Sequence, residues 1–153
     1  MTRNKIPLFF WIFLTAFAMV ATFFFSSQNA ALSSSSSLRV LSFLLRRFPF
    51  LSALGGVERL HIIVRKLAHF TLYFTLGCGL RGLYDYQRRV PAAPAAVLTA
   101  ALYAASDEFH QRFSSGRGPS LRDVALDACG AAAGCALISL LFFLTRPKNA
   151  DNP

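Results

Sequence analysis

The stretch Ile6–Phe25, IPLFFWIFLTAFAMVATFFF, contains no charged residue and follows Arg3 and Lys5. A helix of about 20 apolar residues is long enough to cross the hydrocarbon core of a bilayer. A signal peptide has the same basic start, but its apolar core is usually only about 7–15 residues long. The apolar run here exceeds that length. We therefore interpret Ile6–Phe25 as a retained transmembrane helix.

The composition of the whole chain agrees with a membrane protein. Of the 153 residues, 54% are hydrophobic and 15% are charged, whereas soluble domains average about 25% charged residues. The apolar content also excludes intrinsic disorder. The net charge of +9 would suit a nucleic-acid-binding protein, but the basic residues are scattered in the gaps between apolar runs, as membrane-flanking cations are. Because there is no basic stripe and no RNA-binding motif, we expect no nucleic-acid partner.

Apolar segments later in the chain predict further spans, separated by short connections that carry charged residues, proline and glycine. The predicted fold is all-α, a polytopic membrane protein in which residues 1–153 form one domain, a bundle of four transmembrane helices with a short interfacial segment. The expected spans are residues 6–25, 64–83, 92–110 and 123–145, and residues 26–60 are expected to form a loop and interfacial segment.

The connection after the first span has two parts of different character. Ser26–Ser37 is rich in serine and is predicted to be a loop. Leu38–Leu54 mixes arginine with leucine and phenylalanine and contains Pro49, so it is predicted to lie in the headgroup region with an interruption at the proline.

The second connection and the C-terminal tail are compact and basic, which is typical of cytoplasmic segments. Both termini are therefore predicted to be cytoplasmic.

Small residues inside the apolar runs indicate helix packing. Gly130 and Gly134 form a small-xxx-small pattern, which is typical of helices that approach one another closely. Cys78, Cys129 and Cys135 also lie in apolar runs, their number is odd, and no CxxC spacing occurs. We therefore expect neither a disulfide framework nor a zinc site, and interpret the cysteines as packing residues.

The polar residues of the predicted bundle are concentrated at one of its ends. In a four-span protein, the end of the first span, the start of the second, the end of the third and the start of the fourth lie at the same membrane face. An ionisable side chain in a span costs about 2.5–3.5 kcal/mol at the bilayer centre, so it usually faces a partner or a polar cavity. The candidate ligand-binding residues at this face are Lys66, His69, Tyr73, Asp107, Glu108, His110, Gln111, Arg117, Asp123 and Asp127.

Helical spacing groups several of these side chains. Lys66, His69 and Tyr73 follow one another at i, i+3 and i+7 and so form one stripe. Asp123 and Asp127 are four residues apart, and Asp127 has already entered an apolar run. A carboxylate at that depth needs a donor or a cation nearby. The candidate partners are Arg117, Lys66 and His69.

Three segments, in this order, carry a resemblance to a known family. They are FFFSSQ (Phe23–Gln28), RKLAHFTLYFTLG (Arg65–Gly77) and YAASDEFHQRFSSGRGPSLRDVALDACGAAAG (Tyr103–Gly134). The third is long and specific, with DE-x-H-Q, G-R and D-x-x-x-D elements followed by two glycines. In these segments the chain resembles the VanZ-like family of small membrane proteins, whose named role is to lower sensitivity to the glycopeptide antibiotic teicoplanin.

The resemblance implies a multi-pass protein of the bacterial cytoplasmic membrane, and its motif positions coincide with nearly all of the candidate residues. One departure is visible, because Leu72 stands where many relatives have a glutamate before the tyrosine of the second motif. If that carboxylate forms part of the family's polar site, Glu108 is a residue that could compensate for it.

Two classes of function fit this pattern. The first is a non-enzymatic envelope protein that needs no cofactor. Its polar end would bind a lipid headgroup, a lipid-linked cell-wall precursor or a glycopeptide, and so alter antibiotic sensitivity. Lys66 and Arg117 would contact an anionic group of the ligand. We favour this class because no nucleophile and base stand out as a pair.

The alternative is a membrane-embedded enzyme that acts on a phosphorylated lipid. It would use a divalent cation, with His69 or His110 as acid or base and Arg117 on the phosphate. Its metal ligands would be Asp107, Glu108, Asp123 and Asp127. A small transporter is a weaker third reading, because the polar groups gather at one end instead of running through the bundle.

Overall fold

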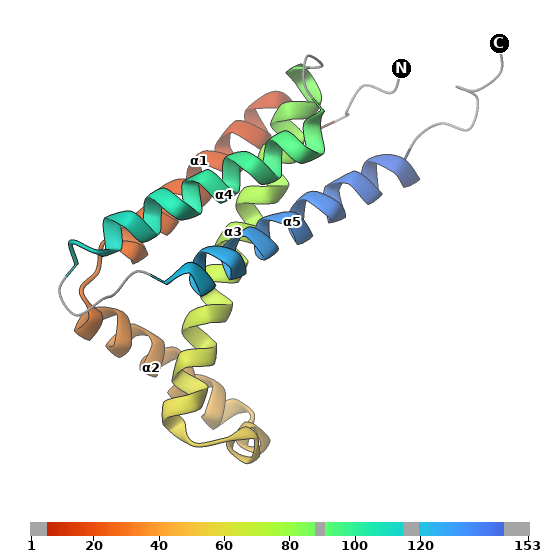
Figure 1. Cartoon of the computed structure of the whole chain (residues 1–153). Helices are drawn as coiled ribbons and strands as arrows, with labels where there is room; N and C mark the ends of the chain where they lie inside the picture. Colours follow the sequence, from red (N-terminus) through yellow and green to blue (C-terminus); the bar gives the residue numbers. More distant parts are fainter. Residues whose placement is uncertain (1–5, 88–90, 115–119, 146–153) are drawn as a thin grey trace, which may run out of the picture.

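A computed structural model describes residues 6–87, 91–114 and 120–145, which form helices and no strand. The all-α prediction is confirmed for these residues. Figure 1 shows the order of the elements along the chain. They are α1 (Leu8–Ser26), α2 (Ala30–Arg47), the 3₁₀ helix η1 (Pro49–Leu54), α3 (Val57–Gln87), α4 (Ala92–Gln111) and α5 (Leu121–Leu144).

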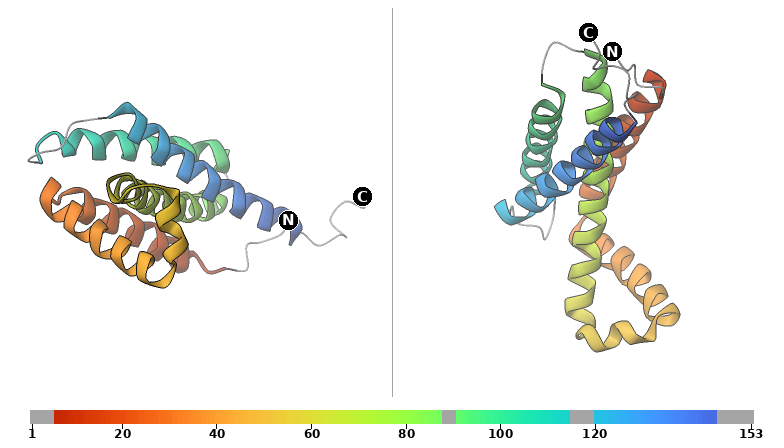
Figure 2. Two further views of the ribbon diagram at one scale, coloured as in Figure 1. Left: turned by 90° about the horizontal axis from the view of Figure 1, so that it is seen from below. Right: turned by 90° about the vertical axis from the view of Figure 1, so that its right-hand side faces the viewer.

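Helix α3 is the central element. It contacts α1, α2, α4 and α5, and its contact with α5 is the most extensive of the helix pairs. With 31 residues it is about 46 Å long at 1.5 Å per residue, which exceeds the roughly 30 Å of a bilayer core. Its N-terminal part therefore projects beyond the other long helices, together with α2 and η1 (Figure 2).

Glycines allow α3 and α5 to cross at very short range. A Cβ atom at Gly134 would lie 2.0 Å from the backbone oxygen of Phe74, and one at Gly130 would lie 2.7 Å from that of Phe70. From the opposite side, a Cβ at Gly77 would lie 2.1 Å from the backbone oxygen of Ala131. The close packing predicted from Gly130 and Gly134 is confirmed, and α3 contributes a matching glycine.

The serine-rich segment differs from the expectation. The prediction of a loop over Ser26–Ser37 was wrong, because most of this segment is the first half of α2. The Asn29 side chain accepts a hydrogen bond from the backbone N–H of Leu32 and caps the helix. The hydroxyls of Ser35 and Ser37 donate to backbone carbonyls one turn earlier, which satisfies them within the helix.

The rest of the connection agrees with the sequence. Helix α2 ends at Arg47, and Pro49 opens η1. The interruption expected at the proline is therefore confirmed. Only a small part of α2 is buried, namely Ser33 and Leu41.

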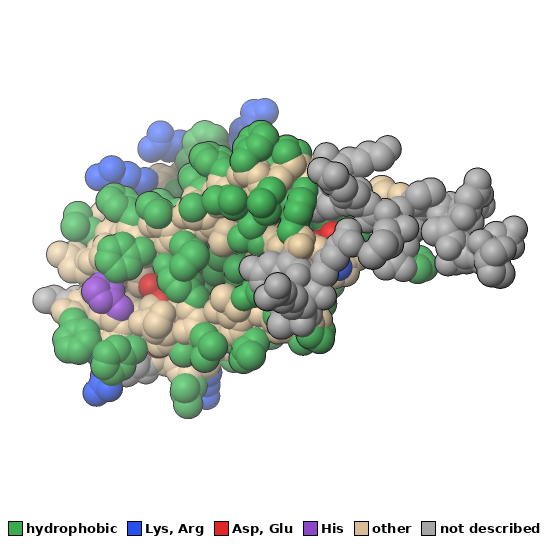
Figure 3. All heavy atoms as spheres, turned by 90° about the horizontal axis from the view of Figure 1, so that it is seen from above, with side chains coloured by type: hydrophobic (Ala, Val, Ile, Leu, Met, Phe, Trp, Pro, Cys, Tyr) green, Lys and Arg blue, Asp and Glu red, His purple; other side chains and the backbone are tan. Residues whose placement is uncertain are grey.

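Two of the described helices, α1 and α5, are long and apolar enough to cross a membrane. Their apolar side chains are largely outside the core. On α1, Phe9 is 71% exposed, Phe13 66% and Val20 68%, and Figure 3 shows apolar side chains spread over one face of the molecule. A water-soluble monomer rarely exposes so much contiguous apolar surface, so these side chains indicate a membrane protein.

Candidate functional site

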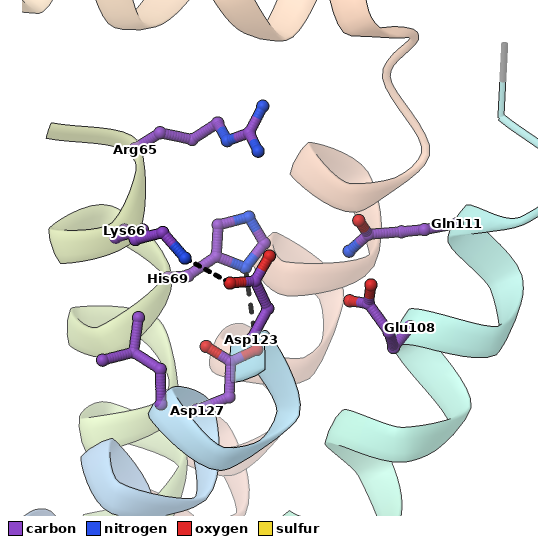
Figure 4. A pocket seen from close by; sticks show the side chains of 8 residues that line it. Arg65, Lys66, His69, Glu108, Gln111, Asp123 and Asp127 are labelled. Carbon is purple, nitrogen blue, oxygen red and sulfur yellow. Dashed lines mark hydrogen bonds and ion pairs between the residues drawn. The ribbon is translucent and has the colours of Figure 1, made fainter. Parts of the chain in front are cut away.

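A polar pocket lies where α3, α4 and α5 meet, at the end of the bundle next to α2 (Figures 1 and 4). All but one of the side chains that surround it are polar or charged, although the helices that carry them are otherwise largely apolar. The lining residues are Arg65, Lys66, His69, Glu108, Gln111, Asp123, Leu126 and Asp127.

Two polar contacts join α3 to α5 along one wall of the pocket. The Lys66 ammonium donates a hydrogen bond to the Asp123 carboxylate. One turn deeper, His69 Nδ1 lies 3.9 Å from Asp127 Oδ2. Because the α3 pair is spaced i, i+3 and the α5 pair i, i+4, each pair occupies one face of its helix. The two polar stripes therefore face each other across the helix crossing.

Helix α4 supplies the opposite wall. The side chains of Glu108 and Gln111 point across the pocket toward His69 and Asp123 (Figure 4). The Glu108 carboxylate accepts the backbone N–H of Ser120, the residue just before α5. This hydrogen bond ties the end of α4 to the start of α5.

Asp107 lies behind this wall and does not line the pocket. Its carboxylate accepts a hydrogen bond of 3.1 Å from the Gln111 amide and interacts with the Ser26 hydroxyl at the end of α1. It is 5% exposed. Asp107 thereby connects the first helix to α4 and supports the side chain of Gln111.

Two buried polar atoms near the pocket floor have no hydrogen-bond partner in the described part of the chain. They are Asp127 Oδ1 and the Tyr73 hydroxyl oxygen. Asp127 is 4% exposed and Tyr73 is fully buried. An unsatisfied buried polar group costs about 1–3 kcal/mol. Such a cost is expected at a functional site, where a ligand supplies the missing partner.

The structure brings most, but not all, of the candidate residues together. Tyr73 and Asp107 lie beside the pocket. The His110 ring packs 5.3 Å from the ring of Phe23 on α1, outside the lining. Arg117 falls outside the described residues. The lining contains these candidates: Lys66, His69, Glu108, Gln111, Asp123 and Asp127.

Sequence reasoning did not select Arg65 as a site residue, although it lines the pocket. The signal was present in the spacing, because Arg65 is four residues before His69 and shares its helix face.

A second polar cluster was also missed, at the other end of α3. There Arg81 donates hydrogen bonds to Ser139 and Asp85 and lies over the Phe142 ring. These groups satisfy one another, which is typical of structural packing.

The carboxylates of the alternative metal site are not arranged around a common point. In the part of the chain that the structure describes, no group of three His, Cys, Asp or Glu side chains could hold a metal ion. Asp107 is engaged by Gln111, Glu108 by the Ser120 backbone, and Asp123 by Lys66.

The apolar outer surface and the charged pocket at one end of the bundle define a helical integral membrane protein with a polar site. The comparison with protein families makes the assignment specific. The family model described as VanZ/LLP1 matches residues 10–143, and the chain belongs to this family. No curated protein and no solved structure matches the chain.

Proposed function

We propose that the polar pocket binds the headgroup of an amphiphile, either a membrane lipid or a lipid-linked cell-wall precursor, or a glycopeptide antibiotic, and that the protein thereby modulates antibiotic sensitivity in the cell envelope. The observation that carries this proposal is the pocket itself, in which Asp127 is buried with one oxygen unpartnered. Charged residues inside a membrane bundle are expensive and generally serve a ligand, an ion or a partner.

The proposed topology has four spans, with both termini in the cytoplasm and the pocket at the outer face. Helix α4 has 20 residues and so reaches about 30 Å, the thickness of the hydrocarbon core. Both α3 and α4 pack along α5, and their buried polar groups face the pocket region. These features support α3 and α4 as the second and third spans, although α1 and α5 alone are apolar enough to be recognised by hydropathy.

In the same arrangement, α2 and η1 lie on the outer membrane surface. Phe43 on α2 is 67% exposed and Phe50 on η1 is 68% exposed. Arg39, Arg46 and Arg47 are exposed on the same segment. Exposed aromatic side chains together with cations are the pattern of a helix that lies in the headgroup region.

This topology predicts that α2 and the two termini lie on opposite sides of the membrane. A cysteine introduced at Ser35, in a variant without the native cysteines, is expected to react with a membrane-impermeant thiol reagent applied to intact cells. Cysteines added before Arg3 and after Pro153 are expected to react only after the membrane is permeabilised. Labelling of α2 and both termini from the same side would contradict four spans, and labelling of the termini alone in intact cells would reverse the orientation.

The proposed site also predicts an effect on antibiotic sensitivity. In a strain whose glycopeptide sensitivity depends on this protein, Glu108→Ala and Arg117→Ala are each expected to return sensitivity to the level of the deletion strain. Glu108→Ala removes the contact with the Ser120 backbone and a charged group of the pocket. Arg112→Ala is the control, because Arg112 is exposed and is not part of the lining. The minimum inhibitory concentration is the measurement. Unchanged sensitivity in Glu108→Ala and Arg117→Ala, at normal protein levels, would contradict the site.

A further inference from the structure

The pocket contains a cation and a carboxylate oxygen that have no partner among the described residues. The Arg65 guanidinium is half-buried in the lining and makes no hydrogen bond or ion pair with the described residues. At the floor, Asp127 Oδ1 is buried without a partner. The other wall-forming charges, Lys66 and Asp123, already neutralise each other. The Glu108 carboxylate already accepts a backbone N–H. Arg65 and Asp127 Oδ1 are therefore the cation and the carboxylate oxygen of the lining that have no partner among the described residues.

These two groups lie at different depths in the pocket. Arg65 precedes His69 by four residues of α3, which is about 6 Å along the helix axis. His69 Nδ1 is 3.9 Å from Asp127 Oδ2. In Figure 4, Arg65 lies on the far side of His69 from Asp127. A ligand that meets both groups must therefore carry its negative and positive charges on a short linker.

The chemistry of the guanidinium and of the carboxylate further limits the class of ligand that the pocket can bind. A guanidinium presents a planar set of donors that matches phosphate oxygens. Phosphate is the anion of the headgroup layer. The helix segments that carry the pocket residues lie at the end of the bundle beside α2. An unpartnered carboxylate oxygen requires a hydrogen-bond donor, and the strongest such donor is a charged N–H group. A primary ammonium has this group, whereas a quaternary ammonium does not.

We propose that the pocket recognises a zwitterion in which a phosphate and a primary ammonium are joined by a short linker, as in a phosphoethanolamine headgroup. The phosphate binds Arg65, and the ammonium donates to Asp127. The Glu108 carboxylate and the Gln111 amide oxygen face the same space from α4 and are further acceptors for the ammonium. This inference rests on the proposed function, because it names the ligand class of the same pocket.

The test measures lipid retention by the full-length protein in phosphatidylcholine nanodiscs. Increasing amounts of phosphatidylethanolamine or phosphatidylglycerol compete with a fluorescent phosphatidylethanolamine. Phosphatidylethanolamine is expected to displace the probe about tenfold more effectively than phosphatidylglycerol or additional phosphatidylcholine. A tenfold difference corresponds to the effect of one charge-assisted hydrogen bond. Free phosphoethanolamine in solution forms a separate arm. Full competition by the free compound identifies a soluble ligand of the same chemistry, and competition by the lipid alone identifies a lipid headgroup.

Two variants test the ammonium contact and the phosphate contact of the ligand separately. Asp127→Asn is expected to abolish the preference for phosphatidylethanolamine over phosphatidylglycerol while retaining phosphate binding. Arg65→Gln is expected to weaken binding of both lipids about tenfold. Arg59→Gln is the matched control, because Arg59 is on the same helix but exposed and outside the lining. The lipid comparison on the unaltered protein is independent of how well any variant folds.

The outcomes distinguish this inference from the proposed function. Saturable binding with equal affinity for phosphatidylethanolamine and phosphatidylcholine overturns the ammonium assignment and leaves a headgroup-binding pocket. Arg65→Gln with unchanged affinity overturns the phosphate assignment. If the probe shows no saturable binding and neither a cell-wall precursor nor a glycopeptide binds, the proposed function fails and the inference fails with it.

Discussion

Gly134→Leu is expected to prevent α3 and α5 from crossing, so that little folded protein is recovered from the membrane. Even the first carbon of a new side chain at this position would lie 2.0 Å from the Phe74 backbone oxygen. Because backbone atoms cannot move aside as a flexible side chain can, the helices must separate. Overpacking in a well-packed core typically costs about 1–3 kcal/mol, and a collision between two helix backbones is expected to lie at or above that range.

Unfolding can be followed with a thiol-reactive dye in detergent. Cys78 and Cys135 are buried and free, whereas Cys129 is exposed, so a Cys129→Ser background reports only on opening of the core. Gly134→Leu is expected to give immediate labelling at low temperature, and it also separates the two polar stripes that line the pocket. Gly56→Ala is the control, because a Cβ there would meet no atom within 4 Å. If Gly134→Leu unfolded cooperatively at the unfolding temperature of the unaltered protein, this helix crossing would not be what holds the bundle together.

Trp11→Ala is expected to lower the stability of the bundle by the largest amount of any single truncation in α1. Trp11 is 1% exposed, and its ring occupies the space beside Gly82, where a Cβ would lie 2.1 Å from the indole. It also packs edge-on against Phe142 of α5, with ring centroids 6.1 Å apart. Truncation of a buried tryptophan costs about 3–5 kcal/mol in soluble cores. The part due to lost van der Waals contacts applies equally in a bilayer, where such contacts drive helix association.

The same dye assay measures this loss as a lower unfolding temperature. Phe13→Ala is the matched control on the same helix, because Phe13 is 66% exposed and faces outward. Trp11 lies near the start of α1, whereas the pocket lies at the opposite end, beside Ser26. The folded fraction of Trp11→Ala is therefore expected to keep its lipid preference. Equal unfolding temperatures for Trp11→Ala and Phe13→Ala would contradict the packing of α1 against α3.

Much of the fold could be predicted because apolar runs and their interruptions are local features. The four long helices α1, α3, α4 and α5 occupy the segments expected for spans, and Pro49 separates α2 from η1. The serine-rich segment was the exception. Serine composition indicates a loop on average, but here the Asn29 cap and hydrogen bonds back to the preceding turn favour a helix.

The candidate site could be predicted in part because connectivity determines which helix ends share a membrane face. Connectivity correctly predicts that Lys66, Glu108 and Asp123 lie at one end of the bundle. It could not separate residues that line the pocket from residues beside it. His110 and Gln111 are adjacent in sequence, yet the first packs on Phe23 and the second faces the pocket, since neighbouring residues on a helix point about 100° apart.

The sequence by itself determined that this is a helical membrane protein with charge concentrated at one end, because apolar length, helical periodicity and the cost of an ionisable group in a bilayer depend only on the order of residues. Only the tertiary structure decided which charges pair. The glycine-lined crossing of α3 and α5 sets the rotation of each helix, and that rotation joins Lys66 to Asp123 while Arg65 and one oxygen of Asp127 stay unpaired within the described residues. Helix rotation depends on contacts between residues far apart in the chain, which no local pattern records.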